Sequence, residues 1–286
     1  MNTSASLFKQ KFVYVGPIAL SAFSLFLSYH LLQPIAVWFD PTFTLLASRG
    51  VGKIAFTSAV ILHILLLLTT VSHNFMRHFF ATNVLFLTGV QWLKTFFGLF
   101  TLFFTLHSCV LAAAVMLGYA TFQPELLALI PSKVGSLLWG LVATFFLAWT
   151  EELIFRGTLY PFFRQGMSKI ASALLASTIF MIVHNLTDPL DLLTTHWQLG
   201  LGLFLFGFML NSFFVLTEKL YVGMGVHAGT VFVKVFIRRI PCITYFSTLP
   251  WWLNGDLRQA PLAHALFGLV AVILWVVIVR REKSSR

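Results

Sequence analysis

Three charged residues follow a long apolar stretch in the middle of the chain. Residues 134–150 carry no charge, and the next six residues include Glu151, Glu152 and Arg156. On a helix, Glu152 and Arg156 are separated by one turn and by about 40° around the axis, so they can form an ion pair. Glu151 points about 100° away from Glu152 and has no local partner. We therefore expect Glu151 to face another helix or a water-filled cavity.

Two histidines in later apolar stretches could complete a hydrolytic site with this glutamate. His184 follows the apolar letters FMIV, and His227 lies between Gly225 and Gly229, a spacing that allows close packing of a neighbouring helix. A carboxylate can act as a general base toward water, while one imidazole orients the water and another stabilises developing negative charge. The same residues could instead bind zinc with water as the fourth ligand, although an HExxH motif is absent from the sequence. Both chemistries remain open at this stage.

The elements that must position these residues are membrane helices. Hydrophobic residues make up 58% of the 286-residue chain and charged residues only 10%, and the mean hydropathy is +0.88. A soluble domain has about 25% charged residues. The charge-free stretches predict an all-α, polytopic membrane helix bundle of about eight transmembrane helices, near residues 12–33, 54–72, 97–119, 134–153, 169–187, 199–216, 220–236 and 261–279. We expect the seventh, which is short, to be tilted or partly re-entrant, and residues 79–93 to form an interfacial or re-entrant helix.

We expect a single membrane domain with three segments. Residues 1–130 hold the N-terminal transmembrane helices and the interfacial segment, residues 131–240 the catalytic core, and residues 241–286 a loop, the last helix and a basic tail. Placing both termini in the cytoplasm puts twelve of the nineteen basic residues on that side, as the positive-inside rule requires. The basic residues lie between apolar stretches or at the ends of the chain, so the net charge of +10 does not indicate a nucleic-acid partner.

The ordered motifs resemble those of a family of intramembrane endopeptidases. This is the CPBP family, the CAAX protease and bacteriocin-processing (Abi) proteins, which includes the type II CAAX prenyl endopeptidases. The resemblance covers roughly residues 134–237 and rests on three motifs: Glu151-Glu152-x-x-x-Arg156, Phe180-x-x-x-His184 and His227 in a glycine-flanked helix.

The resemblance implies a role for each motif residue and a site recessed among helices that opens toward the cytoplasm. It implies that Glu151 deprotonates the attacking water, that His184 binds and polarises this water, and that His227 stabilises the oxyanion. Glu152 and Arg156 would then be a supporting pair. Members of the family are described both as metalloendopeptidases and as glutamate-dependent enzymes. We expect that no cofactor is required, with Zn²⁺ bound by Glu151, His184 and His227 as the alternative.

One position departs from the family pattern. Many members carry an asparagine four residues after the last histidine, where its amide contributes to the oxyanion hole, whereas this chain has Val231 there. Loss of one such donor lowers the rate by about 10²–10³-fold in other enzymes. Thr230, Asn185 or Asn211 could replace the missing donor, and the sequence does not choose among them.

The sequence therefore predicts an intramembrane protease. Its partners would be the lipid bilayer and membrane-associated or lipid-modified substrates, including CAAX-type prenylated chains. Two alternatives have no proteolytic activity. The first is a membrane scaffold or bacteriocin-immunity protein of the same fold, which Val231 favours. The second is a small proton-coupled transporter, in which Glu151 and the histidines form a proton relay.

Overall fold

The described part of the chain is a bundle of apolar helices. The computed structural model describes residues 30–35, 37–38, 90–185 and 188–284. Within these ranges, five helices are long and apolar enough to span a membrane, and the apolar helical segment Lys169–Asn185 is shorter. The chain is therefore an integral membrane protein with the predicted all-α architecture. Two predicted spans lie outside the described residues, namely 54–72 and, except for residues 30–33, 12–33. Residues 79–89 of the predicted interfacial helix also lie outside them. The total of eight transmembrane helices therefore stays a prediction.

The order of the elements is as follows. The helices are α4 (Gln91–Met116), α5 (Ile130–Ile154), α6 (Tyr160–Arg164), α7 (Lys169–Ile182), α8 (Trp197–Thr217), α9 (Leu220–Arg239) and α10 (Pro261–Ser284). A π-helical segment, Phe155–Leu159, joins α5 to α6. Short 3₁₀ turns cover Pro124–Leu129, Val183–Asn185, Pro189–Leu192 and Leu257–Gln259, and the two short strands are β1 (Ala120–Phe122) and β2 (Ile243–Tyr245).

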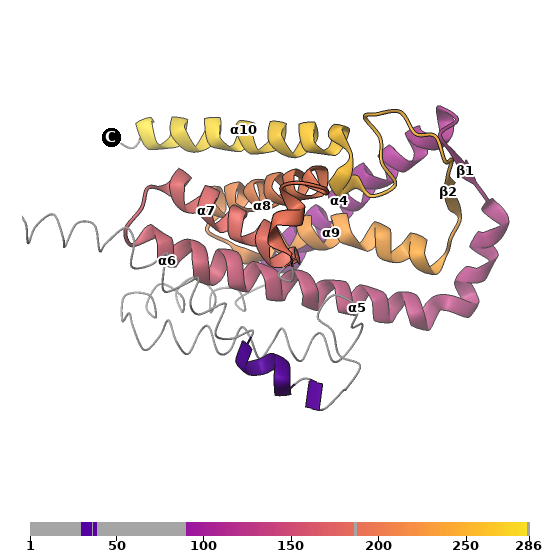
Figure 1. Cartoon of the computed structure of the whole chain (residues 1–286), viewed down its shortest axis with the longest axis horizontal. Helices are drawn as coiled ribbons and strands as arrows, with labels where there is room; N and C mark the ends of the chain where they lie inside the picture. The colour runs from indigo at the N-terminus through magenta and orange to yellow at the C-terminus, as the bar shows by residue number, and fades with distance from the viewer. Residues whose placement is uncertain (1–29, 36, 39–89, 186–187, 285–286) are drawn as a thin grey trace, which may run out of the picture.

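Helices α8 and α9 form the interior of the bundle. Helix α9 packs against α4 and α5, and α8 packs against α7 and α10 (Figure 1). Of the most apolar 18 residues in α8, 56% are buried, and the fraction in α9 is the same. In the continuous helical stretch 124–164, only 6% of the most apolar 18 residues are buried. Side chains that converge on α8 and α9 are therefore enclosed by other helices on most sides.

Two glycines on α9 permit a close contact with a neighbouring helix. A β-carbon built on Gly225 would lie 2.6 Å from the carbonyl oxygen of Phe96, and one on Gly229 would lie 2.4 Å from that of Phe100. Both carbonyls belong to α4, so the close approach predicted from this glycine spacing is confirmed. The predicted alternative of a partly re-entrant segment is wrong, because α9 is a continuous helix of 20 residues, and the alternative of a tilted helix stays a prediction.

The helix that carries the charged motif runs past the predicted end of its span. Pro161 lies one turn beyond the motif, where it cannot donate a backbone N–H and its ring would clash with the carbonyl of Gly157 in a regular α-helix. The wider π turn at Phe155–Leu159 accommodates this proline without ending the helix. The hydroxyl of Thr158 donates to the carbonyl of Leu153 at 2.9 Å, five residues back, in the same turn. The motif is therefore held in a continuous helix.

The two ends of the bundle differ in structure. At one end, β1 pairs antiparallel with β2, with Ala120 opposite Tyr245 (Figure 1). At the other end lie α6, the start of α7 and the C-terminal part of α10, where Lys169 and Glu282 form an ion pair of 2.5 Å. We refer to this second end as the α6 end; the charge distribution predicts it to be cytoplasmic.

Candidate active site

A fully buried ion pair forms the base of the candidate site. Arg156 Nη1 donates to Glu152 Oε1 at 3.1 Å, and the two side chains are 0% and 1% exposed. Arg156 Nη2 also donates to the carbonyl oxygen of Gly207 on α8 at 2.8 Å. The guanidinium carbon lies 5.0 Å from the centre of the Phe180 ring. The ion pair predicted from the helical spacing is confirmed, and it joins α5 to α7 and α8.

His227 connects this ion pair to the second glutamate. Its Nδ1 lies 3.1 Å from Glu152 Oε1, and its Nε2 lies 3.7 Å from Glu151 Oε2. The imidazole is 4% exposed and packs against the edge of the Phe206 ring, with 5.2 Å between ring centres. Gly223, one turn before His227 on α9, leaves space for the carboxylate, since a β-carbon there would lie 2.4 Å from Glu152 Oε2.

His184 approaches Glu151 from another helix. It lies in the 3₁₀ turn Val183–Asn185 that directly continues α7, within the apolar helical segment Lys169–Asn185, so the predicted location of His184 in this span is confirmed. Its Nδ1 is 2.6 Å from the carbonyl oxygen of Phe180, and its Nε2 is 4.0 Å from Glu151 Oε2. The His184 and Glu151 side chains are 25% and 16% exposed, so this side of the site is the more accessible one.

The hydrogen-bond partners determine which ring nitrogens carry hydrogen. A backbone carbonyl and an ionised carboxylate only accept hydrogen bonds, so Nδ1 of His184 and Nδ1 of His227 must both donate. In the neutral rings, each Nε2 therefore presents a lone pair toward Glu151. Glu151 Oε2 is buried and has no hydrogen-bond partner among the described residues. Three acceptors thus face one another at separations too long for a direct hydrogen bond and within reach of one bridging water.

This arrangement can bind and polarise a water molecule. A water between the three acceptors can donate to Glu151 Oε2 and to one imidazole, which leaves its oxygen lone pairs free for attack. The low exposure of Glu152, Arg156 and His227 means that charges in the site are weakly screened. These are the conditions under which a carboxylate acts effectively as a general base.

The three residues that could replace the missing asparagine use their donors elsewhere. Thr230 Oγ1 donates to the carbonyl of Val226, and Asn185 Nδ2 donates to Asp191 Oδ2. Asn211 Nδ2 donates to Ser177 Oγ at 2.9 Å and to the carbonyl of Ala173 at 3.3 Å. The donor suited to an oxyanion is therefore His227 Nε2, in the protonated form of the ring.

The same three residues do not have the spacing of a zinc site. Two ligand atoms of a tetrahedral zinc site are about 3.3 Å apart, since each bond measures about 2.0–2.1 Å. Glu151 Oε2 is 3.7 Å and 4.0 Å from the two Nε2 atoms, and within the described ranges no group of three His, Cys, Asp or Glu side chains is arranged to hold a metal. The three residues as placed therefore do not fit a zinc ion.

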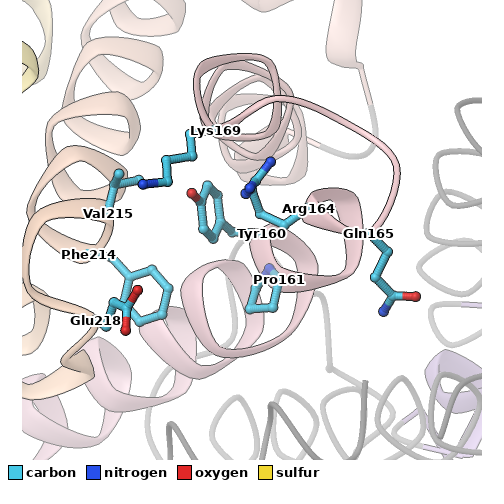
Figure 2. Close-up of a pocket in the computed structure, with 8 residues that line it drawn as sticks. All are labelled: Tyr160, Pro161, Arg164, Gln165, Lys169, Phe214, Val215 and Glu218. Atoms are coloured by element: carbon cyan, nitrogen blue, oxygen red, sulfur yellow. The ribbon is translucent and has the colours of Figure 1, made fainter. Parts of the chain in front are cut away.

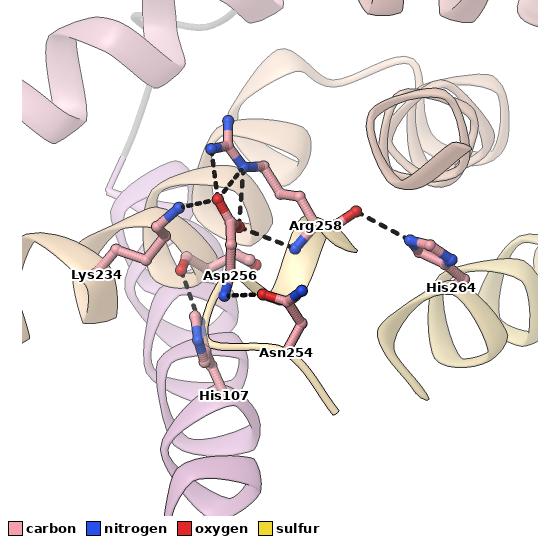
Figure 3. A network of polar contacts seen from close by, with 7 residues as sticks. His107, Lys234, Asn254, Asp256, Arg258 and His264 are labelled. Carbon is pink, nitrogen blue, oxygen red and sulfur yellow. Dashed lines mark hydrogen bonds and ion pairs between the residues drawn. The ribbon is translucent and has the colours of Figure 1, made fainter. Parts of the chain in front are cut away.

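A second polar cluster joins α9 to the loop before α10 (Figure 3). Asp256 accepts from Lys234 Nζ at 2.8 Å and from Arg258 Nη2 at 2.7 Å, and the carbonyl of Arg258 lies 2.9 Å from His264 Nε2. Burial alone would raise the pKa of Asp256, but hydrogen bonds and charge from Arg258 and Lys234 outweigh it and hold this pKa well below its usual range. The cluster fixes the loop between α9 and α10.

Sequence reasoning did not find every residue that shapes the site. The Gly207 carbonyl and the absent side chain of Gly223 both position the ion pair, and neither residue belongs to one of the three motifs. Phe206, whose ring packs against His227, likewise lies outside the motifs. A glycine or phenylalanine in an apolar helix gives no signal of this kind, because its role depends on a neighbour far away in the sequence.

Taken together, the fold and the site define an integral membrane helix bundle with a buried cluster of carboxylates and imidazoles. The family model for type II CAAX prenyl endopeptidase Rce1-like matches residues 133–233. This range contains Glu151, Glu152, Arg156, His184 and His227, and the match confirms the predicted resemblance to the CPBP and CAAX protease family over about a third of the chain. At the level of the family, it supports a CAAX-type intramembrane protease with membrane-associated substrates. Neither the curated proteins nor the solved structures include a significant match.

Proposed function

We propose that the protein is an intramembrane endopeptidase for membrane-associated or lipid-modified chains, including CAAX-type prenylated ones, and that Glu151, His184 and His227 carry out the hydrolysis. The observation that carries this proposal is the position of Glu151 Oε2, 3.7 Å from His227 Nε2 and 4.0 Å from His184 Nε2. These atoms come from three helical segments that are distant in sequence, and their side chains are between 4% and 25% exposed.

In the proposed reaction, Glu151 takes a proton from water as the water oxygen bonds to the peptide carbonyl carbon. His184, neutral, accepts a hydrogen bond from the same water through Nε2. His227, protonated on both nitrogens, donates from Nε2 to the oxyanion, and Glu152 next to Nδ1 stabilises this cation. When the carbon–nitrogen bond breaks, the proton held by Glu151 passes to the leaving amine.

The proposal is tested with the full-length protein in proteoliposomes and a farnesylated peptide with a CAAX terminus. Cleavage is followed by mass spectrometry of the products. Glu151→Gln should lower the rate by about 10²–10⁴-fold, because the amide cannot take the proton. Thermal unfolding in detergent should be nearly unchanged, because Glu151 has no hydrogen-bond partner at Oε2 to lose.

Glu125→Gln is the matched control, since Glu125 is exposed in the 3₁₀ turn before α5. This variant should cleave at the wild-type rate. A folded Glu151→Gln protein that also cleaves at the wild-type rate would show that this carboxylate is not the base.

A non-catalytic scaffold is the second candidate. The observation that favours it is the replacement of the family asparagine by Val231, together with the use of the Thr230, Asn185 and Asn211 donors in other hydrogen bonds. A scaffold predicts that the wild-type protein cleaves no prenylated peptide and that Glu151→Gln leaves its cellular phenotype intact. The Val231→Asn variant discriminates further, because restoring the amide should raise the cleavage rate of an enzyme and leave a scaffold inactive.

A further inference from the structure

A cavity of about 310 Å³ lies at the α6 end of the bundle (Figure 2). Its walls come from α6, the start of α7 and the last turn of α8. The lining residues are Tyr160, Pro161, Arg164, Gln165, Lys169, Phe214, Val215 and Glu218. None of the residues proposed for hydrolysis lines it.

One side of this cavity carries hydrogen-bond donors that are available to a ligand. Tyr160 is 6% exposed, it lines the cavity, and its hydroxyl makes no hydrogen bond among the described residues. In Figure 2 this hydroxyl lies between the head groups of Lys169 and Arg164. Arg164 uses one N–H for the carbonyl of Met167, and Lys169 uses one for Glu282, so both keep further donors.

The rest of the cavity suits a ligand with both a charged and an apolar part. Phe214 and Val215 of α8 and Pro161 of α6 supply apolar walls next to the donors. Glu218, at the C-terminal end of α8, lies on the other side of the cavity, where its carboxylate would repel a second anionic group. Charge and polarity together therefore favour a ligand with one anionic group and an apolar remainder.

We propose that this cavity binds the headgroup of a membrane phospholipid, with its single phosphate on Tyr160, Arg164 and Lys169 and its glycerol backbone against Phe214 and Val215. Basic pockets between helices on the cytoplasmic side of membrane proteins bind lipid phosphates in this manner. The α6 end is the end that the basic residues predict to be cytoplasmic, so the donors lie at the depth of the headgroups. This proposal does not depend on proteolytic activity.

The test is native mass spectrometry of the delipidated full-length protein, titrated with phosphatidylglycerol. Diacylglycerol, which lacks the phosphate, should bind much more weakly. Soluble glycerol 3-phosphate, as a competitor, shows how far the phosphate binds without its chains. Tyr160→Phe removes one hydroxyl and should lower the affinity for phosphatidylglycerol by about tenfold, as expected for one hydrogen bond to a charged group. Lys169→Gln should have at least the same effect.

Arg281→Gln is the matched control, because Arg281 is an exposed cation in the last turn of α10 and does not line the cavity. It should leave phosphatidylglycerol binding unchanged. The proposal is overturned if Tyr160→Phe binds as tightly as the wild type, if diacylglycerol binds as tightly as phosphatidylglycerol, or if Arg281→Gln weakens binding as much as Lys169→Gln. Tyr160→Phe keeps the buried ring, so a correctly folded variant is expected for the decisive comparison.

Discussion

Removal of Arg156 is the sharpest perturbation of the buried ion pair. Arg156 is fully buried and donates to Glu152 and to the Gly207 carbonyl, so Arg156→Met leaves the Glu152 carboxylate buried without a compensating charge. Loss of one partner of a buried pair destabilises proteins by about 3–5 kcal/mol. We expect a decrease of this size in the free energy of unfolding. Unfolding in a detergent and denaturant titration measures it.

The double variant Glu152→Gln/Arg156→Met separates charge from packing. The amide of glutamine can still accept from His227 Nδ1, so the tautomer of His227 is kept while both charges are removed. We expect most of the lost stability to return, except for about 1 kcal/mol for the lost hydrogen bond from Arg156 Nη2 to the Gly207 carbonyl. Proteolytic activity should remain low, because the neutral amide no longer stabilises a protonated His227.

Two results would refute this reasoning. If Arg156→Met changes the unfolding free energy by less than about 1 kcal/mol, the guanidinium does not neutralise a buried carboxylate. If the double variant is as unstable as Arg156→Met alone, the loss comes from packing or from the Gly207 contact, and the charge of Glu152 is not its cause.

Three further predictions address the site and the loop. Gly223→Ala should lower kcat by about 10²-fold with little change in KM, because the added β-carbon displaces Glu152, which orients His227. Gly268→Ala is the control and should leave kcat unchanged, because its β-carbon would have nothing within 4 Å. Treatment with EDTA should leave cleavage unchanged, and activity that is lost with EDTA and restored by zinc would contradict metal-independent hydrolysis. The stability that Asp256 contributes should be complete above its ordinary pKa of 3.8 and be lost as the pH falls toward the lower pKa of the folded protein. Asp256→Asn should remove this acid dependence, as followed by unfolding at pH values from about 5 downward.

Local spacing was sufficient to predict the parts of the site that lie within one helix. Glu152 and Arg156 are four residues apart, and an α-helical turn brings them together whatever surrounds them. The close approach allowed by Gly225 and Gly229 was likewise predictable, because it depends on the absence of side chains at that spacing. The continuation of the helix through the π segment before Pro161 was not predictable, since a proline can also end a helix.

The sequence by itself determined the membrane class, the apolar helices of the described region and the residue types available for hydrolysis. These follow from composition and from periodicities within single helices. Only the tertiary structure decided that Glu151 faces both imidazoles, that Glu152 accepts from His227, and that the donors of Asn185, Asn211 and Thr230 serve other partners. The physical reason is that each of these contacts depends on how helices rotate and pack against one another, and a one-residue rotation of about 100° would turn a side chain away from the cluster.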